Sequence, residues 1–156
     1  AAGDSSIEQT ILPIPAVPSS HAIGHAFAEI AAAFMAACRP VCVVRTGLVW
    51  RRDGPLAAGM RALDGALPPA LEGSVVSAVA LDDLVSLLAE VDDREGTHGT
   101  WDFGGQAVAL TDLRRLDWGT GPPVPFGPWM QQVLASDLVA GASAESEFGI
   151  PARPLL

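Results

Sequence analysis

The chain has 156 residues, of which 49% are hydrophobic and only 17% are charged, so it can bury the core of one domain and is too apolar to be intrinsically disordered. Its formal net charge is −9, with 18 acidic residues against nine basic residues, all of them arginine. A surface of that sign repels phosphate backbones and anionic lipids, so we expect neither nucleic acid nor a membrane as a partner.

The most apolar stretch, residues 22–38, is interrupted by a glycine, a histidine and a glutamate. It is also shorter than the roughly 20 apolar residues that a membrane-spanning helix needs. No basic start precedes an apolar core at the beginning of the sequence, so we expect no secretory signal and a cytoplasmic protein. In that compartment Cys38 and Cys42 are predicted to be buried free thiols, with a disulfide or a metal pair as the alternative.

Residues 1–20 contain three prolines and end in two serines, which predicts an irregular segment and a serine N-cap for the helix that follows. This helix is expected to end at Cys38, because Pro40 cannot continue it. The apolar run 41–45 then has the composition of a strand that is buried in a parallel sheet.

The second part of the chain alternates short helices and strands. A turn over residues 51–55 precedes a helix over 56–67, and the valine-rich residues 74–81 predict another strand. Asp82 and Asp83 are expected to cap a helix over 84–91. The remaining elements are expected to be strands at 100–103 and 108–110, helices at 112–116 and 129–139, and a loop over the proline- and glycine-rich residues 119–128.

His21 and His25 are four residues apart in the first predicted helix, so they share one of its faces, and Glu29 extends that face by one turn. Histidine exchanges protons near neutral pH, which suits a general acid or base. Two zinc ligands on a helix have the same spacing, but zincins place a glutamate directly after the first histidine, where this chain has Ala22. We expect no metal; zinc binding and a purely structural pair of histidines remain alternatives.

Five short motifs follow this helix in order. They are residues 42–50 (Cys-Val-Val-Arg-Thr-Gly-Leu-Val-Trp), 80–84 (Ala-Leu-Asp-Asp-Leu), 99–105 (Gly-Thr-Trp-Asp-Phe-Gly-Gly), 108–113 (Val-Ala-Leu-Thr-Asp-Leu) and 148–153 (Phe-Gly-Ile-Pro-Ala-Arg). The ordered series resembles the C-terminal half of the extended short-chain dehydrogenase/reductases, the NAD(P)-dependent epimerase/dehydratase family. That family carries Tyr-x-x-x-Lys in the helix, whereas this chain has His21 and His25 there and contains no tyrosine and no lysine.

The resemblance implies an α/β fold: the C-terminal part of a Rossmann-like, doubly wound parallel sheet plus a small α/β substrate-binding region. Residues 1–50 would form the loop, active-site helix and strand of the core. Residues 51–156 would form the substrate-binding region, with one strand near 74–81 returning to the core. The family's glycine-rich cofactor fingerprint lies in its N-terminal half and is absent here. We therefore expect an N-terminal nucleotide-binding companion, from the same polypeptide or a separate chain, and aggregation without it.

The resemblance also implies a set of site residues. It places the catalytic pair at His21 and His25, the contacts to NAD or NADP at Arg45, Thr46, Gly47 and Leu48, and the contacts to substrate at Trp50, Arg51 and Arg52. The family often has a phosphate-binding arginine seven residues before the second aspartate of its Val-Asp-Asp motif, and this chain has Val76 there. Nucleoside-diphosphate sugars are therefore disfavoured, and an apolar ligand is favoured.

The leading functional hypothesis is an enzyme of small-molecule metabolism, such as natural-product biosynthesis, with a degenerate active site in which His21 transfers a proton. The rival hypothesis is a catalytically silent binding or scaffold subunit, and retained hydride chemistry is a third. In the family the helix that corresponds to residues 19–38 also builds homodimers. Its many alanines permit close helix approach, so we expect a homodimer here.

Overall fold

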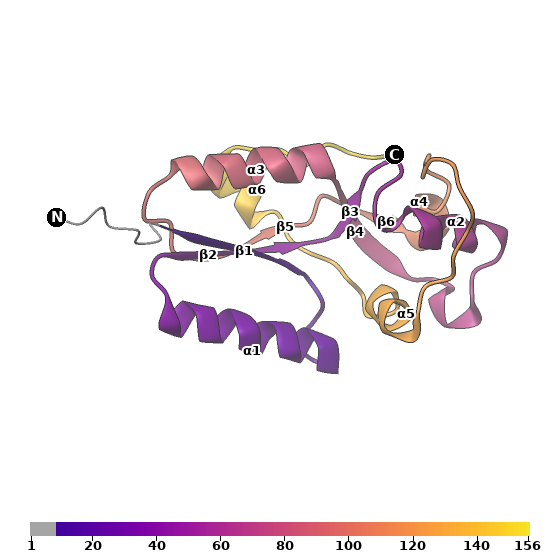
Figure 1. Ribbon diagram of the computed structural model, residues 1–156, viewed down its shortest axis with the longest axis horizontal. Coiled ribbons are helices and arrows are strands. Elements are labelled where there is room, and N and C mark those ends of the chain that lie inside the picture. The colour runs from indigo at the N-terminus through magenta and orange to yellow at the C-terminus, as the bar shows by residue number, and fades with distance from the viewer. Residues whose placement is uncertain (1–8) are drawn as a thin grey trace.

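The structure is a computed structural model that describes residues 9–156, and it consists of two small sheets covered by helices (Figure 1). The strands are β1 (Thr10–Pro15), β2 (Val41–Thr46), β3 (Leu48–Trp50), β4 (Val75–Ala80), β5 (Gly99–Phe103) and β6 (Gln106–Ala109). The helices are α1 (Ala22–Ala37), α2 (Ala57–Gly65), α3 (Leu81–Asp93), α4 (Leu110–Leu113), α5 (Pro128–Leu134) and α6 (Ser143–Phe148), with a 3-10 turn at Pro69–Leu71. The α/β fold class predicted from the sequence is confirmed.

The first sheet has the order β1-β2-β5 and is parallel throughout. Helix α1 lies on one face, and α3 and α6 lie on the other (Figure 1). Because successive side chains of a strand point to opposite faces, Val41 and Val43 pack toward α1, while Cys42 and Val44 pack toward α3. Strand β2 is therefore buried on both sides, as its composition predicts. Burial also raises the pKa of the Cys42 thiol to about 11.

The chain passes from the first sheet to the second at Gly47, the single residue between β2 and β3. A Cβ atom at this position would lie 2.4 Å from the carbonyl oxygen of Ser77 on β4, so only glycine permits the close crossing. In the second sheet β4 pairs parallel with β3 and antiparallel with β6. Helices α2, α4 and α5 supply its core, which includes Met60, Leu110 and Leu134.

The prediction of an irregular N-terminal segment is wrong over residues 10–15, which form β1 despite two prolines. The Thr10 N–H donates to the carbonyl of Pro40, just before β2, at 3.1 Å, and the Ala16 N–H donates to Thr46 of β2 at 2.8 Å. The alternate residues Ile11, Pro13 and Pro15 therefore face the open edge. A proline there gives up no hydrogen bond within this sheet, which is why an edge strand tolerates it. Residues 1–8 of the predicted segment lie outside the described residues.

Three further expectations need correction. Helix α1 has His21 as its N-cap and no side-chain cap bond, so neither serine caps it. The strand near 74–81 pairs with β3 and β6, and the strand that pairs with β2 is β5 instead. Helix α3 begins at Leu81, so Asp82 and Asp83 lie inside its first turn and do not cap it. Helix α6 was not expected from the sequence.

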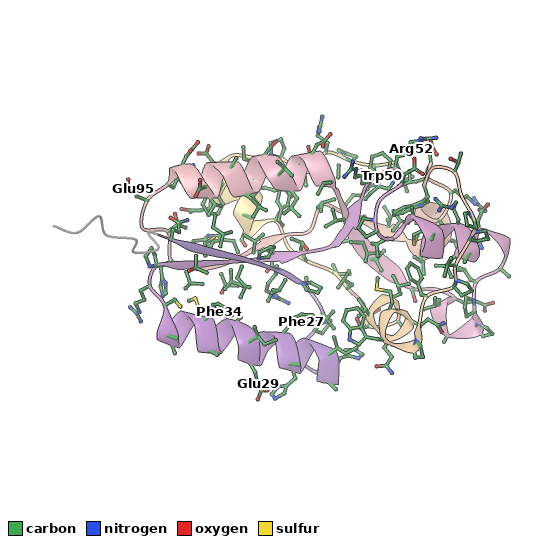
Figure 2. The ribbon with its side chains drawn as sticks, viewed as in Figure 1. Phe27, Glu29, Phe34, Trp50, Arg52 and Glu95 are labelled. Carbon is green, nitrogen blue, oxygen red and sulfur yellow. The ribbon has the colours of Figure 1, made fainter. Side chains whose placement is uncertain are left out.

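Helix α1 is apolar yet mostly solvent-exposed. Gly24 is its only buried residue, and Ile30 and Phe34 are 45% and 38% exposed. Phe27 lies between α1 and the sheet, whereas Glu29 projects away from it (Figure 2). The exposed surface of α1 therefore carries two large apolar side chains, Ile30 and Phe34, as well as the polar pair His25 and Glu29. Among residues 9–156, no helix is long and apolar enough to cross a membrane.

Candidate functional site

A cleft of about 450 Å³ opens where β1 and β2 end. Ligands of open α/β sheets bind at the carboxyl ends of the strands, so this is the first place to look for a site. Its wall is apolar and comes from both ends of the sequence. The lining consists of Pro13, Ile14, Pro15, Thr46, Gly47, Leu48, Val49, Arg51, Pro55, Leu56, Leu81, Leu84, Trp129, Met130, Val133 and Leu138.

Three of the four residues predicted to contact a cofactor meet in this cleft. Thr46 is buried, and its carbonyl accepts the N–H of Ala16 at 2.8 Å, while Gly47 and Leu48 follow directly. Arg45 points to the opposite face of the sheet. There its guanidinium lies 3.4 Å from Asp102 on β5 and borders a separate hollow under α1. The alternation of side chains along β2 separates Arg45 from Thr46.

The predicted substrate contacts divide between the cleft and a neighbouring hollow of about 280 Å³. Arg51 lines both spaces, whereas Trp50 and Arg52 line only the hollow, together with residues at the start of α3 (Figure 2). No carboxylate in the described part of the chain lies within 4 Å of the Arg51 guanidinium. Arg51 is thus the only charged side chain that the cleft presents.

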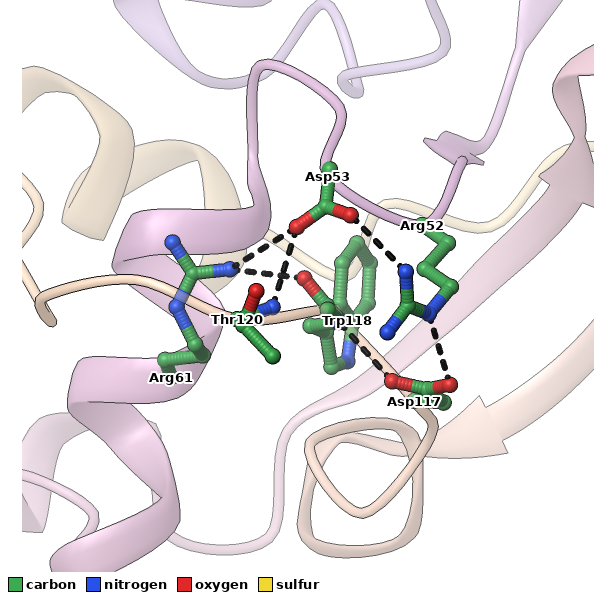
Figure 3. Close-up of polar contacts among 7 residues, drawn as sticks. Arg52, Asp53, Arg61, Asp117, Trp118 and Thr120 are labelled. Carbon is green, nitrogen blue, oxygen red and sulfur yellow. Dashed lines mark hydrogen bonds and ion pairs between the residues drawn. The ribbon is translucent and has the colours of Figure 1, made fainter.

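Arg52 is occupied by a polar network that joins two loops (Figure 3). Its Nε donates to Asp117 at 2.9 Å and its Nη1 donates to Asp53 at 3.0 Å. The hydrogen bond to Asp117 raises the pKa of Arg52, and the pKa of Asp117 is lowered by the Gly119 N–H and by Arg52. Asp53 also accepts the N–H of Thr120 at 3.0 Å. We conclude that Arg52 fixes the rim of the hollow and is not free to bind a ligand.

The two histidines lie outside the cleft. His21 is exposed at the start of α1 and lines a separate hollow with Gln132 of α5 and with Ser136, which follows that helix. His25 faces solvent and lies 3.3 Å from Glu29, four residues along the same helix. The predicted shared face of α1 is therefore present, but it points away from the apolar cleft. Across residues 9–156, no three histidine, cysteine, aspartate or glutamate side chains are grouped as a metal site requires.

Asp83 has a structural role that the sequence analysis missed. Its buried carboxylate accepts the Arg153 backbone N–H at 2.9 Å and the Arg153 Nε at 2.7 Å. Burial by itself would raise the pKa of Asp83, but these hydrogen bonds from Arg153 outweigh it and hold the pKa below its ordinary value. The pair fastens the C-terminal tail to the start of α3, beside two residues of the cleft wall, Leu81 and Leu84.

Sequence reasoning also missed the wall that α5 and the β1 end supply. Trp129 of α5 lines the cleft with 53% of its surface exposed. The prolines of β1 by themselves predict an irregular segment. Their alternate spacing, Pro13 and Pro15, was the available signal, because it matches one edge of a strand.

No protein-family model matches the sequence, and no curated protein is similar to it. Solved structures are similar at the level of the fold. TunA, an NAD-dependent NDP-hexosamine 5,6-dehydratase involved in tunicamycin biosynthesis, has a TM-score of 0.61 at 14% identity, with 94% of this chain and 58% of that chain covered. The Bordetella bronchiseptica enzyme WbmG, solved with NAD and UDP, has a TM-score of 0.60 at 17% identity, covering 95% and 54%.

UDP-glucose 4-epimerase from Thermotoga maritima gives a TM-score of 0.58 at 14% identity, with 94% of this chain and 59% of that chain covered. The resemblance found in the sequence motifs is thus confirmed at the level of the fold. The chain therefore has the Rossmann-like fold of NAD-dependent epimerases and dehydratases, and it spans little more than half the length of those enzymes.

Proposed function

We propose that this chain is the ligand-binding, substrate-side part of an epimerase/dehydratase-like assembly, and that it supplies no proton-transfer group to its own cleft. One observation carries the proposal. The cleft lies at the strand ends where this fold binds ligands, yet the residues among 9–156 that line it include no histidine, carboxylate, tyrosine or lysine. Of the hypotheses raised by the sequence, a catalytically silent binding subunit fits this cleft best.

A companion that completes the fold is part of the proposal. The exposed apolar side chains of α1 and the open edge of β1 support it, because both leave groups that a larger body would cover. Pro13 and Pro15 remove two N–H donors from that edge, so an added strand would pair regularly only near Ile11. We also propose that a second copy packs against α1, where the exposed side chains of Ile30 and Phe34 supply burial.

The fold implies a dinucleotide cofactor, NAD or NADP. The described residues could bind only part of such a molecule. Thr46, Gly47 and Leu48 line the cleft, and its mainly apolar wall suits the ring end of a dinucleotide. A pyrophosphate needs backbone N–H groups at a helix N-terminus after a glycine-rich turn, and residues 9–156 contain no such turn. The companion would supply that part.

His21 as an acid or base is the second candidate. Its support is position: the exposed imidazole stands at the start of α1, and α5 contributes residues both to its hollow and to the cleft. In an assembled protein the companion could enclose both spaces, and His21 would then exchange a proton with a bound small molecule.

Two measurements separate these proposals. Titration of NAD(H) and NADP(H) against the chain alone and against the chain with its companion should show binding only in the assembly. Replacing His21 by Phe should leave turnover unchanged, with His25→Phe as the matched control. A selective loss of turnover in His21→Phe would make the second candidate the function. Tight binding of a dinucleotide by the chain alone would refute the proposal that the companion supplies the pyrophosphate-binding part of the site. A stable, monodisperse monomer would count against the companion itself.

A further inference from the structure

We propose that the cleft takes an amphiphilic anion, a small molecule with an apolar body and one carboxylate, and that Arg51 pairs with the carboxylate. The inference rests on the proposed ligand-binding role of the cleft and names the ligand class. The solved neighbours that bind UDP or UDP-sugars do not suggest it. It comes from the way in which this cleft combines apolar and charged groups.

The apolar part of the cleft selects against sugars. Leucine, isoleucine, valine, proline, methionine and tryptophan side chains make up almost all of the lining, and Thr46 contributes the only hydroxyl. A sugar ring buried here would lose water from several hydroxyl groups and find few partners for them. An alkyl chain or hydrocarbon ring loses no hydrogen bond on entry and gains the burial of its own surface.

The charge of Arg51 selects for an anion. Most other arginines of the chain are bound by a carboxylate or a carbonyl, as Arg52 is by Asp117 and Asp53. Asp82 borders the neighbouring hollow with Arg51, but the two form no ion pair within 4 Å. In a chain of net charge −9, an unpaired guanidinium at the rim of an apolar cleft is the place where a carboxylate would be held.

The dimensions agree with one small ligand. The cleft volume of about 450 Å³ falls in the range of about 300–1,000 Å³ that small-molecule sites occupy. Trp129 stands at the cleft with 53% of its surface exposed, so an apolar body in the cleft would cover part of an indole that water now touches. Trp129 is therefore expected to contact the body of the ligand, and Arg51 its head.

The test uses calorimetric titration of the full chain in its native assembly, with any companion retained. The probes are decanoate, the neutral decanol and UDP-glucose, each below the concentration at which it aggregates. Decanoate should bind more tightly than decanol, and UDP-glucose should not compete with it. Arg51→Gln should weaken decanoate binding by about tenfold or more and leave decanol unchanged, because it removes a charge-assisted contact. Arg39→Gln, the same charge change on an exposed arginine outside the cleft lining, is the matched control.

Trp129→Ala provides a second variant that does not depend on Arg51, and it should weaken decanoate and decanol to the same extent. The proposal is overturned if decanoate does not bind, if Arg51→Gln and Arg39→Gln weaken it equally, or if UDP-glucose displaces it. If decanol and decanoate bound equally, the cleft would still be a ligand site, but the proposal that its ligand is an anion would be refuted. Turnover that depends on His21 would refute the proposal that the chain is catalytically silent, and it would not affect the conclusion about the ligand class of the cleft.

Discussion

The bond between Asp83 and Arg153 gives the sharpest prediction about stability. Asp83→Asn keeps the shape of the side chain but removes the charge that two Arg153 donors share, at 2.9 Å and 2.7 Å. Hydrogen bonds to a charged group contribute about 1.5–3 kcal/mol when buried. Since the Arg153 side chain is 68% exposed, water screens the pair, and we expect a loss of about 1–2 kcal/mol at pH 7.

The pH dependence follows from the lowered pKa of Asp83. A group whose pKa is lower in the folded state stabilises the fold above its unfolded pKa, about 3.9 for aspartate, and this contribution is lost as the pH falls through the folded value. The difference in unfolding free energy between the wild-type chain and Asp83→Asn should therefore be full at pH 6–7 and shrink below about pH 4. Urea unfolding followed by tryptophan emission measures it.

Asp82→Asn is the control, because Asp82 lies in the same helical turn, is exposed and has no hydrogen bond from Arg153. Asp82→Asn should lower the free energy of unfolding by only about 0.3–1 kcal/mol, the contribution of a negative charge near a helix N-terminus. If Asp82→Asn destabilised the fold as much as Asp83→Asn, or if the difference for Asp83→Asn persisted unchanged at pH 3, the bond to Arg153 would not be its source.

Three other predictions concern the backbone, the thiols and the sheet edge. Gly119→Ala should lower the melting temperature by about 2–8 °C, because residue 119 has φ +82° and a Cβ there would overlap an oxygen of Asp53. Gly127→Ala, with open space around it, should not. Iodoacetamide at pH 8 should modify the partly exposed Cys38 well before Cys42, as peptide mass mapping would show; equal rates would contradict the burial and the raised pKa of Cys42. Changing both prolines of β1 to valine should restore two backbone N–H donors at its open edge and increase self-association, measured as mass by light scattering. An unchanged mass would show that the prolines do not prevent pairing at this edge.

The sequence by itself determined the local elements whose environment is uniform along their length. The run that became β2 is apolar on both faces, and that pattern alone predicts a buried parallel strand. The first helix had to stop before Pro40, and the proline- and glycine-rich residues 119–128 could form little but a loop. The motif series was also enough to place the chain in a Rossmann-like fold, because the order of elements along a chain restricts its topology.

Tertiary structure decided everything that depends on neighbours distant in sequence. Prolines usually exclude a strand, and they are acceptable in β1 because it is the outer strand of its sheet within residues 9–156 and their missing N–H groups lie on its outer edge. Asp83 looks like a helix cap until Arg153, 70 residues away, reaches it. His25 lies on α1 as its spacing predicts and His21 is the N-cap of that helix, but where the two side chains lie is set by how α1 packs on the sheet. For the same physical reason, only the folded chain shows that the cleft contains Arg51 and neither histidine.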